Sequence, residues 1–175
     1  MGVVGFDLDM TLVDSAEGIV NSISYVCSQY GVVPDAEEVR RTIGIPLDMA
    51  FPLWLPDEPY DVLLASYRSH YRENGIPLTT AMPGATDAIA ELRAAGDRVL
   101  VVTAKYGPVA ELALAAAGLE VDILVGDRFA ETKGEVLKEY GAWAYVGDHI
   151  GDVRAARVAG AHAIAVATGS TTAEE

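Results

Sequence analysis

From Pro83 onward, the sequence alternates between apolar, strand-like runs and helix-like segments. The strand-like runs lie at residues 98–103, 121–125, 143–146 and 162–166, and a fifth, Val-Val-Gly-Phe, lies at residues 3–6 near the start of the chain. Runs that are apolar on both faces and alternate with helices are typical of parallel sheets with right-handed crossovers. The sequence therefore predicts an α/β fold, a doubly wound, Rossmann-like sheet of five parallel strands.

Residues 15–80 interrupt this alternation after the first strand. They contain helix-like patterns and no convincing strand, and Asp14–Glu17 and Asp35–Glu38 resemble the caps that begin helices. Cys27 lies on an apolar helical stripe, so we interpret it as a core residue. We expect residues 1–14 and 81–175 to form one core domain, with residues 15–80 inserted as an α-helical cap.

Composition excludes several classes of function. The formal net charge is −14, from 12 basic and 26 acidic residues, and no basic patch stands out. Nucleic acids and anionic membranes are therefore not expected partners. No apolar stretch reaches the roughly 18 residues of a membrane span. One cysteine allows no internal disulfide, and the N-terminus lacks a secretion signal, so we expect a cytoplasmic protein. The oligomeric state stays open.

Polar side chains follow several of the predicted strands. Asp7 and Asp9 follow the first, Thr103 ends the second, and Asp148 and Asp152 follow the fourth. Lys133 precedes the fourth strand. Taken singly, Thr103 and Asp148 are ordinary caps, and Lys133 is an ordinary surface residue. Ligands bind outside the carboxyl ends of strands in open α/β sheets, so we expect these residues to converge on one site.

Asp7 and Asp9 make a cation the simplest expectation for that site. Two carboxylates two residues apart at a strand end repel each other unless positive charge lies between them. Mg²⁺ prefers oxygen ligands and supplies that charge. The sequence therefore predicts a magnesium site beside the first strand.

The stretch Asp7-Leu-Asp-Met-Thr11, followed by Leu-Val-Asp-Ser15, resembles the first motif of the haloacid dehalogenase-like hydrolases. Thr103, Lys133 and Asp148 then follow in the order of that family's further motifs. The inserted helices resemble the cap of its phosphoglycolate phosphatase-like branch, with Thr42–Leu47 as the candidate specificity loop. The resemblance implies a phosphatase that acts on a small-molecule phosphate ester.

The same resemblance implies a role for each site residue. Asp7 is the nucleophile that forms an aspartyl-phosphate, and Asp9 is the general acid and base. Mg²⁺ is held by Asp7, the Asp9 carbonyl and Asp148, with support from Asp152. The phosphoryl oxygens are held by Thr103, Lys133 and backbone N–H groups around Leu8 and Ala104. In the cap, the cations available for a second anionic group are Arg40, Arg41, Arg68 and Arg72.

The chain departs from the family pattern in a few places. Met10 stands where glycine is frequent, and Gly134 stands where proline often follows the lysine. His149 follows the metal-binding aspartate, where a small residue is common. Relatives usually continue beyond the last strand, whereas residues 168–175 begin like a capped helix and stop, so we expect a chain shortened at its C-terminus.

Two alternative functions stay open. A sugar-phosphate mutase shares the first motif, but such mutases commonly carry histidine, serine and glutamate where this chain has Ile19, Thr103 and Gly147. A phospho-accepting signalling receiver also combines an α/β sheet with clustered Asp, Thr and Lys. Its phosphorylated aspartate ends the third strand, and it lacks a helical insertion after the first.

Overall fold

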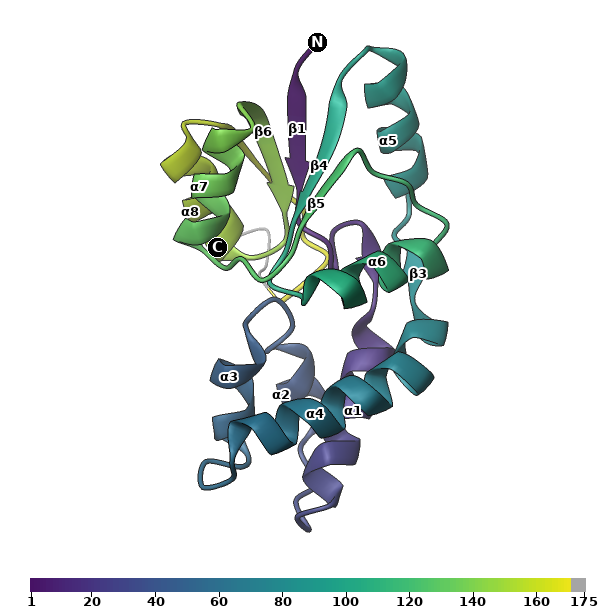
Figure 1. Cartoon of the computed structure of the whole chain (residues 1–175), viewed down its shortest axis with the longest axis vertical. Coiled ribbons are helices and arrows are strands. Elements are labelled where there is room, and N and C mark those ends of the chain that lie inside the picture. The colour runs from purple at the N-terminus through teal and green to yellow at the C-terminus, as the bar shows by residue number, and fades with distance from the viewer. Residues whose placement is uncertain (171–175) are drawn as a thin grey trace.

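The structure, a computed structural model, describes residues 1–170 and has a five-stranded sheet at its centre (Figure 1). The strand order is β5-β4-β1-β6-β7, and all neighbouring strands are parallel. The strands are β1 Val3–Phe6, β4 Arg98–Val102, β5 Ile123–Val125, β6 Ala142–Gly147 and β7 His162–Ala165. The predicted parallel α/β sheet is therefore confirmed.

Four helices cover the two faces of the sheet. Helices α5 and α6 lie on one side, and α7 and α8 lie on the other (Figure 1). Their bounds are α5 Ala85–Ala94, α6 Gly107–Ala116, α7 Glu131–Glu139 and α8 Ile150–Ala159. Successive strand residues alternate between the two faces, so each strand supplies side chains to both cores. In β4, Val99 and Val101 pack on the α5–α6 side, whereas Leu100 and Val102 pack on the α7–α8 side.

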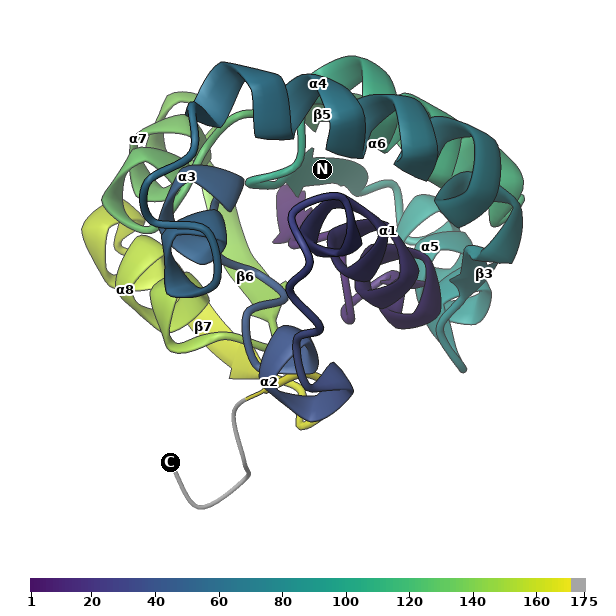
Figure 2. The same ribbon diagram turned by 90° about the horizontal axis from the view of Figure 1, so that it is seen from below.

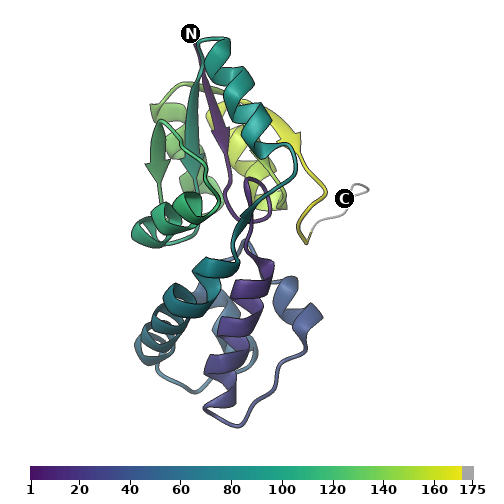
Figure 3. The same cartoon turned by 90° about the vertical axis from the view of Figure 1, so that its right-hand side faces the viewer.

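The segment between β1 and α5 is mostly helical and forms a second lobe below the sheet (Figure 3). Its elements are α1 Ala16–Ser28, α2 Ala36–Arg40, α3 Leu47–Ala50, α4 Tyr60–His70, a π-helical turn at Tyr71–Gly75, and 3-10 turns at Phe51–Leu53 and Ile76–Leu78. Figure 2, which looks from this lobe toward the sheet, shows α4 running beside α1. The lobe has its own apolar core, in which Cys27 is fully buried as predicted.

A short ribbon joins the two lobes. Strand β2, Val13–Asp14, pairs antiparallel with β3, Thr80–Ala81. The sequence predicted no strand between residues 15 and 80, so the start of β3 at Thr80 corrects that boundary. Two residues are too few to give an alternating apolar pattern, which explains why this strand was missed. The division into core and cap stays our proposal, with the ribbon as its hinge.

The predicted helix caps have mixed outcomes. The Asp35 side chain accepts hydrogen bonds from the N–H groups of Glu37 and Glu38, as expected of a cap. The box predicted at Asp14–Glu17 does not form, because the helix begins one residue later with Ser15 as its N-cap; the Asp14 side chain accepts from the Ala16 N–H at 3.2 Å, and the Ser15 hydroxyl donates to Asp9.

The C-terminal segment runs back toward the first motif. Residues 167–170 form turns and bends, not the helix start that the sequence pattern indicates, and residues 171–175 lie outside the described part of the chain. The Thr168 hydroxyl donates to the Met10 carbonyl at 2.5 Å. None of the helices within residues 1–170 has the length and hydrophobicity that crossing a membrane requires.

Candidate active site

The parallel strands bring the predicted residues to one edge of the sheet. Strand β1 lies between β4 and β6, so Asp7, Thr103 and Asp148 follow three neighbouring strands. The Asp7 N–H donates to the Val146 carbonyl at 2.8 Å, which fixes the end of β1 against β6. The strands point toward the helical lobe (Figure 1). The site therefore lies between the sheet and the insertion.

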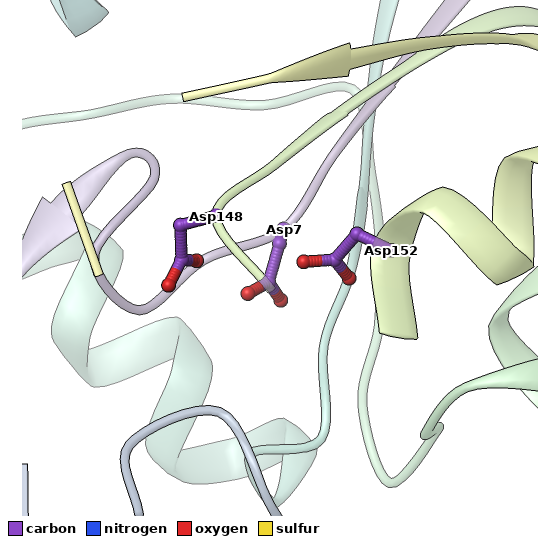
Figure 4. A group of neighbouring side chains, drawn as sticks. All are labelled: Asp7, Asp148 and Asp152. Carbon is purple, nitrogen blue, oxygen red and sulfur yellow. The ribbon is translucent and has the colours of Figure 1, made fainter. Parts of the chain in front are cut away.

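Three carboxylates gather at this edge. Asp7, Asp148 and Asp152 each offer an oxygen atom that lies within 4.8 Å of the others, and all three are buried. Figure 4 shows the Asp7 and Asp148 side chains, from strand ends, pointing the same way side by side, and the Asp152 side chain, from α8, directed toward Asp7. The Lys133 ammonium, from α7, donates to Asp7 at 2.8 Å and to Asp152 at 2.7 Å. Four of the predicted site residues thus form one cluster.

The charges in this cluster are not balanced. Three carboxylates and one ammonium leave two negative charges when all are ionised. Burial, together with the Asp152 and Asp148 charges, raises the pKa of Asp7 to about 8 despite the lowering effect of Lys133. Burial also raises the pKa of Asp148 to about 6. The Asp148 Oδ1 accepts from the Thr11 hydroxyl at 3.0 Å, whereas its Oδ2 is buried and has no hydrogen-bond partner within residues 1–170.

These features fit a divalent cation. Carboxylate oxygens are the ligands that Mg²⁺ prefers, and two excess negative charges match its charge. The unpartnered Oδ2 of Asp148 is a ligand atom that the described protein groups do not satisfy. The residues that would hold the ion are Asp7, Asp148 and Asp152, together with the Asp9 carbonyl expected from the sequence.

Gly147 leaves room for this arrangement. A Cβ atom at position 147 would lie 2.3 Å from Oδ2 of Asp152, too close for any other residue without a shift of that carboxylate. A similar approach explains the glycine after the lysine, because a Cβ at Gly134 would lie 2.6 Å from Val158 in α8. Helices α7 and α8 pack closely there, which places Lys133 and Asp152 within hydrogen-bonding distance.

Asp9 is not part of the three-carboxylate cluster and has other partners. Its Oδ1 accepts from the Ser15 hydroxyl at 2.6 Å and forms an ion pair with Lys105 at 2.9 Å. Burial lowers the pKa of Lys105, but the charge and hydrogen bond of Asp9, together with Tyr71 and Tyr67, outweigh burial and raise this pKa overall. The sequence reasoning missed both partners. Lys105 follows Thr103 and Ala104 at a strand end, a signal that was available, whereas Ser15 fits a helix cap equally well.

The other predicted residues lie around the same edge. Thr103 is buried, and its hydroxyl accepts from the Lys105 N–H at 3.1 Å. The structure shows no hydrogen bond between the side chains of Thr103 and Asp7. Ala104 lines the adjoining cavity. His149 is the N-cap of α8, where its Nδ1 accepts from the Gly151 N–H at 3.0 Å. Met10 has a φ of 62°, a conformation that glycine adopts more easily.

A cavity of about 290 Å³ separates the insertion from the sheet. Asp9, Ala104 and Lys105 lie on its core side, and the loop Thr42–Leu47 and helix α4 contribute from the insertion. Its walls combine apolar and aromatic side chains with charged ones from both lobes, as in sites for small molecules. The predicted specificity loop therefore borders the cavity that contains Asp9.

The structure combines a parallel α/β sheet, an acidic cluster at the strand ends and a helical insertion after the first strand. A family model of haloacid dehalogenase-like hydrolases matches residues 4–166. The chain belongs to this family.

Individual relatives agree with that assignment. A phosphoglycolate phosphatase of Agrobacterium fabrum is 31% identical over 95% of this chain and 80% of its own. A solved haloacid dehalogenase-like hydrolase of Streptococcus pneumoniae superposes with a TM-score of 0.87 at 26% identity, over 99% of this chain and 88% of its own. The protein tyrosine kinase A of Mycobacterium tuberculosis superposes with a TM-score of 0.82 at 29% identity, over 99% of this chain and 87% of its own.

Proposed function

We propose that this chain is a Mg²⁺-dependent phosphatase that hydrolyses a small-molecule phosphomonoester, phosphoglycolate-like or a sugar phosphate, through an aspartyl-phosphate on Asp7. The observation that carries the proposal is the position of Asp7. It lies at the end of the central strand, buried beside Asp148 and Asp152, with the Lys133 ammonium 2.8 Å away. Family membership and relatives named phosphatases support the reaction class.

In the proposed reaction, Asp7 attacks phosphorus and the ester oxygen leaves. Asp9, which must carry a proton when the ester binds, gives it to that oxygen and then, as a carboxylate, takes a proton from the water that hydrolyses the aspartyl-phosphate. Lys105 and Ser15 orient the Asp9 carboxylate for both steps. Mg²⁺, when bound, offsets the repulsion between the anionic nucleophile and the anionic phosphate.

Lys133 and the strand-end residues position the phosphoryl group. The Lys133 ammonium would neutralise charge on the phosphoryl oxygens, and Thr103 with the backbone around Ala104 would hold them. We propose that residues 15–80 form the cap domain and close over this site at the β2–β3 ribbon, which excludes water from the reacting atoms.

A phosphate-release screen tests the proposal. We expect free phosphate from at least one small phosphomonoester, such as phosphoglycolate, a sugar phosphate or p-nitrophenyl phosphate, in the presence of Mg²⁺. We expect none after treatment with EDTA. No release from any ester across a range of Mg²⁺ concentrations contradicts the proposed activity, and equal release with EDTA contradicts the metal dependence. A nucleotide requirement would point to a kinase-like reaction.

Product analysis separates the phosphatase from the mutase. Ile19, where mutases commonly have histidine, is buried in the apolar core of the insertion and lines the cavity, so it offers no proton-transfer group. Incubation with β-glucose 1-phosphate and Mg²⁺ should release inorganic phosphate, if this ester reacts at all. Glucose 6-phosphate that forms faster than phosphate would favour the mutase.

A further inference from the structure

Some polar groups of the cavity lie apart from the catalytic cluster, and they indicate which chemical group a substrate carries besides its phosphate. Most of the wall facing Asp9 from the insertion is apolar, including Ile19, Ile23 and Leu64. Against such a surface, each buried polar atom needs a hydrogen-bonding partner. Within residues 1–170, the buried side-chain atoms without one are Asp148 Oδ2, Arg68 Nε and Tyr71 Oη. The last two both belong to residues that line the cavity.

Arg68 differs from the other cations of the insertion. Arg40 pairs with Glu37 on the surface, and Arg41 and Arg72 are exposed and do not line the cavity. Arg68 lines the cavity, and its guanidinium lies 4.1 Å from the centroid of the Tyr106 ring. Stacking on an aromatic ring holds the plane of a guanidinium in one orientation.

The charge of Arg68 is not matched by a carboxylate. The two lysines near the site pair with Asp9 and with Asp7 and Asp152. In the part of the chain that the structure describes, Arg68 has no carboxylate partner within 4 Å. An oriented guanidinium with an unsatisfied N–H is suited to a planar, anionic oxygen pair.

Tyr71 lies three residues further along the same helical segment. Its ring stacks on Tyr67, with centroids 5.5 Å apart, and Lys105 lies 4.6 Å from its centroid. The Tyr71 hydroxyl is therefore an additional donor at the cavity wall, on the side of the insertion. The buried side-chain atoms without a partner within residues 1–170 thus lie in two places, one at the catalytic edge and two on α4 and the turn that follows it.

We propose that Arg68, held by Tyr106, determines specificity by binding a second anionic group at the end of the substrate opposite its phosphate. The planar fork of Arg68 can bind a carboxylate or a phosphate, and the charges around it favour the carboxylate. Asp48, Asp127 and Arg128 also line the cavity and together leave one negative charge, which repels a monoanion less than a dianion. This inference rests on the proposed function, since it assigns the phosphate to the Asp7 edge. It narrows the substrate to carboxylated phosphomonoesters and disfavours neutral sugar phosphates.

Hydrolysis of a matched pair of esters tests the proposal. 3-Phosphoglycerate and glycerol 1-phosphate share a three-carbon skeleton and differ in a carboxylate against a hydroxymethyl group. We expect wild-type kcat/KM to favour 3-phosphoglycerate, and Arg68→Gln to reduce this ratio roughly 10- to 100-fold, the range for a lost hydrogen bond to a charged group. Arg72→Gln, an exposed arginine one turn away, should leave the ratio unchanged. Propane-1,3-diol bisphosphate carries a second phosphate in place of the carboxylate. A higher kcat/KM for this ester than for 3-phosphoglycerate would overturn the choice of a carboxylate.

Binding of non-hydrolysable analogues keeps this test independent of turnover. By calorimetry, we expect 3-phosphonopropionate to bind wild type more tightly than propylphosphonate, and Arg68→Gln to remove most of the difference. Equal binding of the two by wild type, or an unchanged difference in Arg68→Gln, overturns the inference even where hydrolysis is normal. Conversely, a selective site in a protein that releases no phosphate contradicts the proposed function and leaves the role of Arg68 standing.

Discussion

Asp7→Asn is expected to abolish Mg²⁺-dependent phosphate release while leaving the fold intact. Asparagine has almost the shape of aspartate, but its amide lacks the anionic oxygen that attacks phosphorus. The rate should fall by on the order of 10⁴-fold or more, as for other enzymes that lose a covalent nucleophile. Phosphate release from the best ester in the screen measures the effect. Asp57→Asn, at an exposed site in the insertion, is the matched control and should keep full activity.

The folded state should tolerate this substitution well. In the metal-free protein, burial and the neighbouring carboxylates raise the pKa of Asp7 from 3.8 to about 8. A carboxyl group with a raised pKa is ionised more readily in the unfolded chain, so its contribution to stability falls as the pH rises from about 4 to about 8. Asparagine removes this cost, and Lys133 keeps its contact with Asp152. In EDTA at pH 8, the Tm should therefore equal or exceed that of wild type.

Two outcomes would contradict this expectation. Near-normal Mg²⁺-dependent activity in Asp7→Asn would show that another group is the nucleophile. A large fall in Tm would show that the lost activity reflects unfolding. It would also show that the contact of Asp7 with Lys133 stabilises the metal-free protein more than burial and the neighbouring carboxylates destabilise it.

The sheet and the position of its strand ends were predictable from sequence because they follow from local patterns. A strand that is apolar on both faces and precedes a helix has few alternatives, and parallel strands place their carboxyl ends at one edge. Asp7 and Asp148 therefore had to lie on the same side of the molecule. That they are near neighbours depends on β1 lying directly beside β6, which no local pattern encodes.

The residues that the sequence reasoning missed depend on tertiary contacts. Ser15 carries the same signal whether it caps a helix or, as here, donates to Asp9. Lys105 lies at a strand end, which the sequence shows, but only the fold reveals that its side chain pairs with Asp9. Arg68 was one of four equivalent arginines in the insertion, and only the packing of α4 against Tyr106 distinguishes it.

Lys133→Ala is expected to weaken both catalysis and stability. The lysine is the only cation that contacts the three-carboxylate cluster in the described part of the chain. Loss of its charge near the phosphoryl oxygens should cost about 2–4 kcal/mol of transition-state stabilisation, roughly 30- to 1,000-fold in kcat/KM. Lys138→Ala, an exposed lysine in the same helix, should leave kcat/KM within about twofold of wild type, in line with the small effect of most surface substitutions.

The stability effect should depend on the metal, and this separates electrostatics from packing. Without Lys133, the buried carboxylates lack a compensating charge, and the free energy of unfolding in EDTA should fall by about 3–5 kcal/mol, the usual cost of breaking a buried pair. Since bound Mg²⁺ would supply positive charge to the same oxygens, Mg²⁺ should raise the Tm of Lys133→Ala more than that of wild type. Equal Mg²⁺ shifts in both proteins would mean that the lysine and the cation act on separate groups, because only a shared set of carboxylates couples the two charges.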